Sequence, residues 1–347
     1  MEYKSIEWIE NSGTIRMLDQ RILPGRVEYL DYSSAEEVAF AIQAMVIRGA
    51  PAIGAAAAYG LAVELSHNDS DNLDTLSSVY EKADAVLRRS RPTAVNLFWA
   101  LDRMSSRVND TTFTTAQELI DFVLSEAHAI AKEDVEICMQ IGMNALELIP
   151  QNALAIHHCN TGGLATVGYG TALGIIRTAH EQGRDISVLV DETRPRLQGA
   201  RLTCWELQQL GISHKLIVDG ASGFFMKQGN VDFCVVGCDR VAANGDVANK
   251  IGTYNLALAA HAHNIPFYVA GPTSTIDLST ESGNDIEIEE RVDTEVVSIG
   301  EERIAPEGTD VGNPAFDVTS AEYISAIITE KGIVRAPYKE NLRALFE

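Results

Sequence analysis

Basic residues are scarce in this chain. Its 347 residues include 27 Lys and Arg against 49 Asp and Glu, which gives a formal net charge of −22. Proteins that bind the phosphate backbone of nucleic acids carry clustered positive charge. The charge balance therefore argues against a nucleic-acid partner and favours a soluble protein, which we expect to be cytoplasmic.

Cysteine pairs and long apolar runs are also lacking. The five cysteines are an odd number with no CxxC spacing, so we expect neither a disulfide framework nor a cysteine-based metal site. The longest weakly polar run, 50–65, is short for a membrane span and contains Pro51, Gly54 and Gly60. The N-terminus lacks the basic-then-apolar pattern of a signal peptide. These features predict a reduced, cytoplasmic protein with no membrane partner.

The length of the chain and the change in its secondary-structure pattern predict two domains, because 347 residues are many for one hydrophobic core. After short strands and turns in 1–30, a capping-box pattern at Ser34 and Glu37 starts a helix. Helices are predicted over 38–47, 51–65, 94–108 and 115–148. We therefore predict an N-terminal helical domain over 1–115, a linking helix over 116–150 and a C-terminal domain over 151–347.

Beyond Pro150, short apolar runs alternate with helical stretches. The predicted strands are 153–158, 186–190, 214–218, 231–237 and 266–270. The predicted helices are 163–181, 199–210, 223–228, 252–263 and, after an acidic irregular region at 276–312, a last one near 320–329. Strands that alternate with helices predict an α/β fold with a Rossmann-like, doubly wound parallel sheet.

Polar residues gather directly after four of these strands. In an open parallel sheet, ligands bind beyond the carboxyl ends of the strands. The segments at those ends contain two thiols, several carboxylates, two amides and three arginines: Cys159–Gly163, Asp191–Gly199, Asp219–Gly220 and Cys238–Arg240. The sequence therefore predicts a binding site at this edge of the sheet.

Cys159 and Asp239 are the leading reactive candidates at that edge. Cys159 lies between a strand and a Gly-rich turn, where the field of a following helix favours thiolate; the alternative is a buried structural cysteine. Asp239 follows an apolar strand, where low dielectric would keep it protonated as an acid; the alternative is a solvated or capping aspartate. Cys204 and Cys234 are better explained as core packing.

Three basic residues lie near predicted helix starts. Arg48 is at a helix–helix junction, Arg91 precedes a helix, and Lys250 with Asn249 precedes another. A positive side chain beside a helix N-terminus makes an anion site, although any one of the three is more simply a solvated surface cation.

Other motifs are weaker. Residues 168–174 resemble a dinucleotide fingerprint, but three residues precede the last glycine and the segment falls inside a predicted helix, which disfavours a dehydrogenase. His157 and His158 point to opposite faces of a strand, and His261 and His263 are two apart on a helix, so neither pair suits a metal.

Long segments, in order and over nearly the whole chain, resemble the methylthioribose-1-phosphate isomerase family. Its superfamily includes ribose-1,5-bisphosphate isomerases and regulatory subunits of the exchange factor for translation initiation factor two. The matching segments are Met45–Gly54, Arg91–Leu97, His158–Gly162, Glu192–Pro195 with Leu197–Thr203, Asp239–Asp246, Asn249–Thr253 and Asn313–Asp317. Cys238, where Ala is expected, and the turn Gly220–Gly223 depart from the family pattern.

The resemblance implies a homodimeric aldose–ketose isomerase of methionine salvage that acts on a small sugar phosphate without a cofactor or metal. It implies that Asp239 is the proton donor and that Cys159 stabilises or relays charge in the transition state. The implied substrate-binding residues are Arg48, Gly49, Ala50, Arg91, Gln198, Asn249 and Lys250.

Several alternatives remain open at this point. An isomerase of ribose 1,5-bisphosphate or of 5-deoxyribose 1-phosphate would use the same chemistry, although a bisphosphate needs a second basic cluster that the sequence does not obviously supply. A non-catalytic regulatory subunit of a nucleotide-exchange complex is a further alternative. It is disfavoured because Cys159, Asp239 and the segments around Arg48 and Arg91 occur together.

Overall fold

The computed structural model describes residues 3–91 and 94–347, so Pro92 and Thr93 of the Arg91 segment lie outside the described residues. The chain divides into two compact units. The first comprises the chain up to Ile137 together with Gly162–Gly170, and the second comprises Cys138–Thr161 and Thr171–Glu347. Each unit has its own hydrophobic core.

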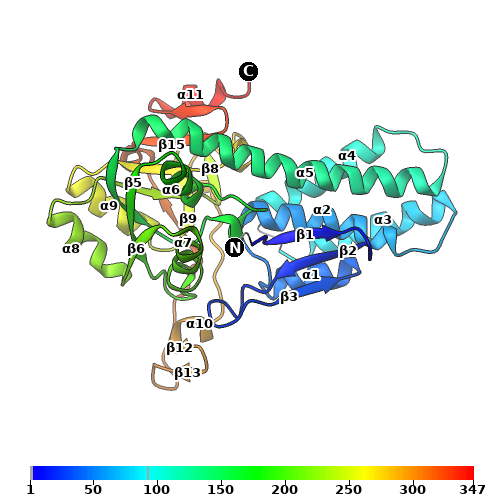
Figure 1. The fold of residues 1–347 in the computed structure, drawn as a ribbon, viewed down its shortest axis with the longest axis horizontal. Helices are drawn as coiled ribbons and strands as arrows, with labels where there is room; N and C mark the ends of the chain where they lie inside the picture. The colour runs from blue at the N-terminus through cyan, green and yellow to red at the C-terminus, as the bar shows by residue number, and fades with distance from the viewer. Residues whose placement is uncertain (1–2, 92–93) are drawn as a thin grey trace. The chain divides into compact units, whose positions relative to one another are not determined.

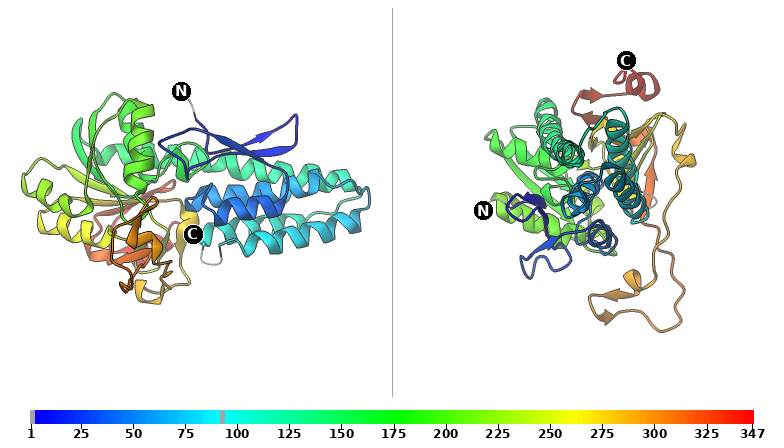
Figure 2. Two further views of the ribbon diagram at one scale, coloured as in Figure 1. Left: turned by 90° about the horizontal axis from the view of Figure 1, so that it is seen from below. Right: turned by 90° about the vertical axis from the view of Figure 1, so that its right-hand side faces the viewer.

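The first unit combines a small antiparallel sheet with long helices (Figures 1 and 2). The sheet has the order β1 (Ile6–Ile9), β2 (Thr14–Leu18), β3 (Tyr29–Tyr32). The helices are α1 (Ala35–Gln43), α2 (Ala50–Ser66), α3 (Leu73–Arg88), α4 (Val95–Asn109) and α5 (Ala116–Ala145), the last of which ends in the second unit. Helix α2 is apolar on all sides and packs against α1, α3 and α4, which makes it the centre of this core.

The start of α1 follows the predicted capping pattern, since Ser34 Oγ accepts a hydrogen bond from the Glu37 nitrogen. The helix ends at Gln43 instead of continuing to residue 47. Met45 has φ 58°, a left-handed conformation that a helix cannot include. The segment 44–49 is therefore a connection, and it carries the Arg48–Gly49 pair.

The second unit is built on a seven-stranded sheet of order β16-β15-β10-β7-β4-β5-β6. Its strands are β4 (Asn152–His157), β5 (Asp185–Asp191), β6 (Ser213–Ile217), β7 (Phe233–Val236), β10 (Phe267–Ala270), β15 (Ala326–Thr329) and β16 (Gly332–Val334). All neighbours pair in parallel except β15 with β16. The five predicted strands are confirmed to within two residues at each end.

The strand order reverses direction at β4. The chain adds β5 and β6 on one side of β4 and then returns to add β7, β10 and β15 on the other side. Connecting helices are α6 (Ala172–Glu181), α7 (Cys204–Leu210), α8 (Ser222–Lys227) and α9 (Thr253–Ala262). The segments after β4 and β7 are in contact, because a Cβ atom on Gly237 would lie 2.7 Å from Thr161 Cγ2. This reversal is where open α/β sheets bind ligands.

A second, smaller sheet of order β11-β8-β9-β14 follows the main sheet. It consists of β11 (Ile276–Asp277), β8 (Arg240–Ala242), β9 (Val247–Lys250) and β14 (Phe316–Thr319). This sheet was not predicted, and its hairpin carries the candidate residues Asn249 and Lys250. Besides β11, the acidic region contains a short 3-10 helix (Gly283–Asp285) and the short elements α10 (Thr294–Val297), β12 (Ser298–Ile299) and β13 (Glu302–Arg303). Helix α11 (Tyr338–Arg343) is near the C-terminus.

One predicted helix is too long and another is wrong. The stretch 163–181 begins with a short 3-10 helix at Gly163–Ala165 and becomes α-helical only at Ala172, because Gly170 has φ 101° and residues 162–170 pack with the first unit. The last predicted helix, 320–329, is a short turn followed by β15, whose four residues are all buried. A short apolar run buried on both faces cannot be told from a helix by periodicity. No helix in the described ranges is long and apolar enough to cross a membrane.

Candidate active site

Cys159 lies directly beyond β4, at the reversal of the sheet, and is 4% exposed. Its φ of 67° is in the left-handed region, which non-glycine residues adopt only when their surroundings impose it. Two threonine hydroxyls impose it here. Thr193 Oγ1 accepts a hydrogen bond from the Cys159 nitrogen at 2.8 Å, and Thr203 Oγ1 donates one to the Cys159 carbonyl at 2.7 Å. The backbone of this cysteine is therefore fixed on both sides.

The loop after β5 supplies those contacts and is itself tightly held. Thr193 has φ 63°, and its hydroxyl donates to the Asp191 carbonyl at 3.1 Å. The carboxylate of Asp219 accepts hydrogen bonds from the backbone nitrogens of Thr193 and Arg194, each at 2.7 Å. The ends of β4, β5 and β6 are thus joined by hydrogen bonds around Cys159.

His158 is 1% exposed and lies beside a carboxylate. Its Nδ1 is 3.0 Å from Asp191 Oδ2, and its Nε2 is 2.8 Å from the Ile251 carbonyl oxygen. Burial alone would lower the pKa of His158, but the hydrogen bond and the charge of Asp191 outweigh it and raise that pKa. Burial raises the pKa of Asp191, and the bond from His158 opposes that rise. Ser222 Oγ donates to the second carboxylate oxygen at 2.6 Å.

In the described part of the chain, one group has the composition of a metal site: His158, Asp191 and Asp219. Both nitrogens of His158 and both oxygens of Asp191 already have protein partners. Both oxygens of Asp219 accept from backbone nitrogens. The arrangement is therefore fully explained as a hydrogen-bond network.

Gln198 lies in the same loop after β5 and is 8% exposed. Its Oε1 atom is buried, and among the described residues it has no hydrogen-bond partner. A buried acceptor without a partner is costly, so it marks a position where a ligand hydroxyl can donate.

Asp239 is half-buried and lies just before β8, three residues beyond the end of β7. Its backbone nitrogen donates to the Ala248 carbonyl at 2.9 Å, which fixes it to the β8–β9 hairpin. Since β4 and β7 are neighbouring parallel strands, Cys159 and Asp239 follow adjacent strand ends at the same edge. The structure therefore brings the two predicted reactive residues to one place in the topology.

The far end of the same hairpin carries Asn249 and Lys250. Lys250 is buried, donates from Nζ to the Ala315 carbonyl at 2.7 Å and lies 4.1 Å from the centre of the Phe316 ring. Asn249 Nδ2 donates to Thr253 Oγ1 at 2.9 Å.

The residues that follow Lys250 contact the Cys159 region through His158. Besides the Ile251 bond, a Cβ atom on Gly252 would lie 2.8 Å from His158 Cε1. Asp317, the last residue of the Asn313–Asp317 segment, accepts from the nitrogens of Gly252 and Tyr254 at the start of α9. Asn249 and Lys250 are thereby placed next to the loop after β4.

The remaining predicted substrate-binding residues belong to the first unit. Arg48 and Gly49 lie in the connection between α1 and α2, Ala50 is the first residue of α2, and Arg91 follows α3. Gly49 has φ 103°, and a Cβ atom there would lie 2.3 Å from the Ala165 oxygen in the 162–170 segment of the same unit. Only glycine fits at this junction.

The other cysteines near the site are not reactive candidates. Burial raises the pKa of Cys238 to about 12, and its sulfur is 3.4 Å from Thr275 Oγ1. Cys234 is completely buried in the core, as predicted, and burial raises the pKa of its thiol strongly. Cys204 is half-buried, and burial raises its pKa to about 11. All three therefore remain neutral thiols near pH 7.

The segment 168–174 needs one correction. Residues 168–171 precede α6 and are not inside a helix, so that reason against a dinucleotide fingerprint is wrong. The segment nevertheless starts eleven residues beyond β4, away from a strand-to-helix turn, and its glycine spacing still differs from the fingerprint.

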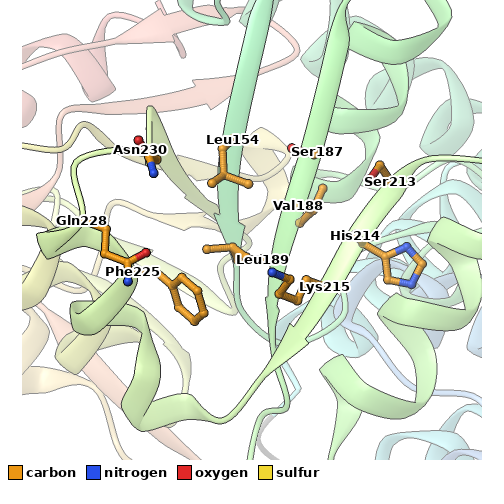
Figure 3. Close-up of a pocket in the computed structure, with 10 residues that line it drawn as sticks. All are labelled: Leu154, Ser187, Val188, Leu189, Ser213, His214, Lys215, Phe225, Gln228 and Asn230. Carbon is orange, nitrogen blue, oxygen red and sulfur yellow. The ribbon is translucent and has the colours of Figure 1, made fainter.

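A cavity of about 310 Å³ in the second unit contains none of the predicted site residues. Figure 3 shows its lining, with Leu154 of β4, Leu189 of β5, Lys215 of β6 and Phe225 of α8 around it. It includes residues near the beginnings of β4 and β5, whereas Cys159 lies beyond the end of β4. The cavity is therefore separate from the edge of the sheet that carries Cys159 and Asp239.

Comparison with known proteins identifies the family. The model of the initiation factor 2 subunit family matches residues 46–336. Methylthioribose-1-phosphate isomerase 2 of Pseudothermotoga lettingae is 57% identical, with 99% of each chain covered, and methylthioribose-1-phosphate isomerase of Synechococcus sp. is 54% identical, with 98% of this chain and 97% of the relative covered.

Two solved structures are similar over nearly their whole length. The 5-methylthioribose 1-phosphate isomerase of Pyrococcus horikoshii has a TM-score of 0.94 at 45% identity, covering 99% of this chain and 95% of that one. The translation initiation factor eIF-2B subunit delta from A. fulgidus has a TM-score of 0.90 at 41% identity, covering 99% of both. The chain therefore belongs to the initiation factor 2 subunit family and, within it, to the methylthioribose-1-phosphate isomerases.

Proposed function

We propose that this chain is an aldose–ketose isomerase that converts 5-methylthioribose 1-phosphate into 5-methylthioribulose 1-phosphate in methionine salvage. The proposal is carried by two facts taken together. Relatives named methylthioribose-1-phosphate isomerase are 51–57% identical over nearly the whole chain, and in this chain a thiol and a carboxyl group follow adjacent strands. The reaction involves no net oxidation, so it requires no redox cofactor.

The chemistry of the substrate assigns a role to Asp239. The anomeric oxygen carries phosphate, so the sugar cannot open through a free hemiacetal. Ring opening needs a proton on the ring oxygen, and we assign its donation to the carboxyl group of Asp239. The half-buried position of Asp239, beyond a fully buried strand, supports this assignment.

Cys159 is assigned to the second half of the reaction, in which a hydrogen moves from C2 to C1. Either its thiolate takes a proton from C2 and returns it to C1 through an enediol-like state, or it stabilises a direct hydride shift. In both routes the C2 hydroxyl loses its proton as the ketone forms, and the Asp239 carboxylate left by ring opening takes that proton up. The fixed backbone of Cys159 supports a role that needs precise placement. In deuterated water, deuterium at C1 of the product would show a proton relay in which the thiol exchanges with solvent, and its absence would favour a hydride shift or a relay shielded from solvent.

Substrate binding is assigned to the seven residues that the family resemblance implies. In the second unit, the unpartnered Gln198 oxygen accepts from a sugar hydroxyl, and Asn249 and Lys250 supply an amide and a positive charge. In the first unit, Arg48, Gly49, Ala50 and Arg91 are proposed to bind the phosphate through guanidinium groups and helix-start nitrogens. The family resemblance supports this second set.

The division of the chain into domains is also part of the proposal. We propose a Rossmann-like catalytic domain over 151–347, a linking helix over 116–150 and a helical N-terminal domain over 1–115. The strand order, with its reversal at β4, supports the first of these. A cytoplasmic homodimer is expected from the family, and light scattering of the purified protein measures its mass.

A comparison of three substrates tests the proposal. Purified protein is assayed with 5-methylthioribose 1-phosphate, 5-deoxyribose 1-phosphate and ribose 1,5-bisphosphate, and we expect the highest kcat/KM on the first. A higher kcat/KM on either other sugar would transfer the assignment to it. Absence of isomerase activity on all three, together with co-purification in a complex of translation-factor subunits, would instead favour the non-catalytic alternative.

A further inference from the structure

His158 has a hydrogen-bond pattern that assigns a hydrogen to one ring nitrogen and, when Asp191 is ionised, to both. The Ile251 carbonyl can only accept, so the nitrogen that it faces at 2.8 Å, Nε2, carries a hydrogen. The other nitrogen, Nδ1, faces Asp191 Oδ2 at 3.0 Å, while the other oxygen of that carboxylate already accepts from Ser222 Oγ. An ionised Asp191 requires a hydrogen on Nδ1 as well, which makes the ring an imidazolium.

The negative charges around the His158 ring favour its protonated form. The carboxylate of Asp219, at the end of β6, and that of Asp317, in β14, act on the ring in addition to that of Asp191. Three carboxylates from three different elements therefore face one buried histidine.

The preceding residue, His157, provides a contrast within the same strand end. Its Nδ1 lies 2.8 Å from the Val235 carbonyl, and its Nε2 lies 3.3 Å from the Thr161 hydroxyl, which can donate to it. Burial lowers the pKa of His157 to about 4. With an ionised Asp191, the two adjacent histidines have opposite protonation states near neutral pH.

We propose that His158 is charged at neutral pH and acts as a positioning residue that holds Cys159 in its reactive conformation. Its two ring hydrogen bonds tie the end of β4 to Asp191 at the end of β5 and to Ile251 before α9. The Asp191 carbonyl accepts from Thr193 Oγ1, which in turn accepts from the Cys159 nitrogen. These hydrogen bonds therefore connect the His158 ring to the backbone of Cys159, the next residue in the sequence.

Nitrogen-15 NMR of the ring tests the protonation state independently of activity. In the full-length protein labelled at histidine, with His158→Gln used for assignment, we expect two ring N–H signals for His158 and one for His157 at pH 7.5. A single ring N–H signal for His158 would overturn the proposal. This readout does not depend on the proposed function.

Two variants test the positioning role in turnover, which rests on the proposed function. In His158→Asn the side-chain amide takes the place of Nδ1 and keeps the bond to Asp191, whereas in His158→Gln it takes the place of Nε2 and keeps the bond to Ile251. We expect kcat of His158→Gln to fall about 10- to 100-fold with little change in KM, as for other residues that orient a reactive group, and His158→Asn to retain more.

The control is the same pair of substitutions at His214, a half-buried histidine on β6 that bonds to the Ile212 carbonyl and lines the separate cavity. Both His214 variants should keep the wild-type kcat. If both His158 variants turn over at the wild-type rate, or lose activity only through KM, the positioning role is wrong. If the wild-type protein acts on none of the three sugars, the proposed function fails, while the NMR result for His158 still stands or falls by itself.

Discussion

The backbone nitrogen of Cys159 lies 2.8 Å from Oγ1 of Thr193, and both residues have positive φ angles, 67° and 63°. Each left-handed non-glycine residue costs roughly 1–2 kcal/mol. Two such residues joined by a hydrogen bond mean that the loops after β4 and β5 hold each other in conformations that neither would adopt alone. The loop after β5 therefore determines where the Cys159 thiol is placed.

Thr193→Val tests this relationship, because valine keeps the shape of the side chain and removes the hydroxyl. The buried nitrogen of Cys159 would lose its acceptor, and we expect the free energy of unfolding to fall by about 1–3 kcal/mol. We expect kcat to fall about tenfold or more, since small displacements of a reactive group reduce turnover strongly. Urea unfolding and steady-state kinetics measure the two effects.

The matched control is Thr319→Val, at a buried threonine of β14 whose hydroxyl has no hydrogen-bond partner among the described residues. Replacing it by a methyl group should leave stability unchanged or slightly higher and should leave kcat unchanged. Equal losses of kcat in both variants would show that Thr193 acts only through general packing.

Cys159→Ser and Asp239→Asn should each lower kcat by about 10²- to 10⁴-fold, the range for loss of a proton-transfer group. Substrate affinity and thermal stability should stay near wild-type values, because both replacements are nearly isosteric. Isothermal titration calorimetry with substrate and a melting curve separate binding and folding from turnover.

Controls for these two variants come from the same types of side chain elsewhere in the second unit. Cys204→Ser changes a half-buried thiol of α7, and Asp232→Asn changes an exposed carboxylate at the opposite end of β7. Both should keep the wild-type kcat. Wild-type turnover by Cys159→Ser or Asp239→Asn would refute the corresponding role.

The strands of the main sheet could be predicted because each is a short apolar run bounded by polar residues. The runs before Cys159 and Cys238 are almost entirely buried, and their bounds were found to within two residues. Once the strands are known, the rule that parallel strands share a carboxyl edge brings Cys159 and Asp239 together without any knowledge of contacts.

The hydrogen-bond network of His158 could not be predicted in this way. Asp191 is 33 residues away in sequence and Ile251 is 93 away, and the second contact uses a backbone carbonyl that has no sequence signature. Without those partners, a histidine inside an apolar strand end is indistinguishable from a neutral core residue. His157 is such a residue, directly beside it.

The elements missed in the sequence have physical causes of the same kind. Strands β8 and β9 have only three and four residues and contain polar side chains that face other parts of the unit, so no alternating pattern is visible. Helix α3 buries Leu76, Tyr80, Ala83 and Leu87 on one narrow face of an otherwise polar segment, a pattern that is present but weak.

Gly49→Ala should destabilise the first unit severely. The residue has φ 103°, and the added Cβ atom would lie 2.3 Å from the backbone oxygen of Ala165, which cannot move aside as a flexible side chain could. We expect a loss of about 3 kcal/mol or more in the free energy of unfolding. Gly183→Ala is the control, because Gly183 also has a positive φ, 78°, but no atom within 4 Å of the added Cβ, so that it should cost only about 1–2 kcal/mol. Equal melting temperatures for the two variants would contradict the close approach at Gly49.

His157 should make the stability of the protein depend on pH in the acid range. Burial lowers its pKa to about 4 in the folded chain, against an ordinary value of 6.5, so between these values the unfolded chain binds a proton that the folded chain excludes. The folded state therefore loses stability as the pH falls from 6.5 to 4, by about 3 kcal/mol in total, and no further below that.

Carboxyl groups with raised pKa values, such as Asp191 and Asp317, act in the opposite direction, so the contribution of His157 has to be measured as a difference. In His157→Asn the amide keeps a donor near the Val235 carbonyl but cannot titrate. The stability advantage of the wild-type protein over this variant, measured by urea unfolding from pH 7.5 to 4, should shrink steadily below pH 6.5. Parallel stability curves for the two proteins would mean that His157 takes up its proton in the folded state, and that the contrast with His158 at the end of β4 is wrong.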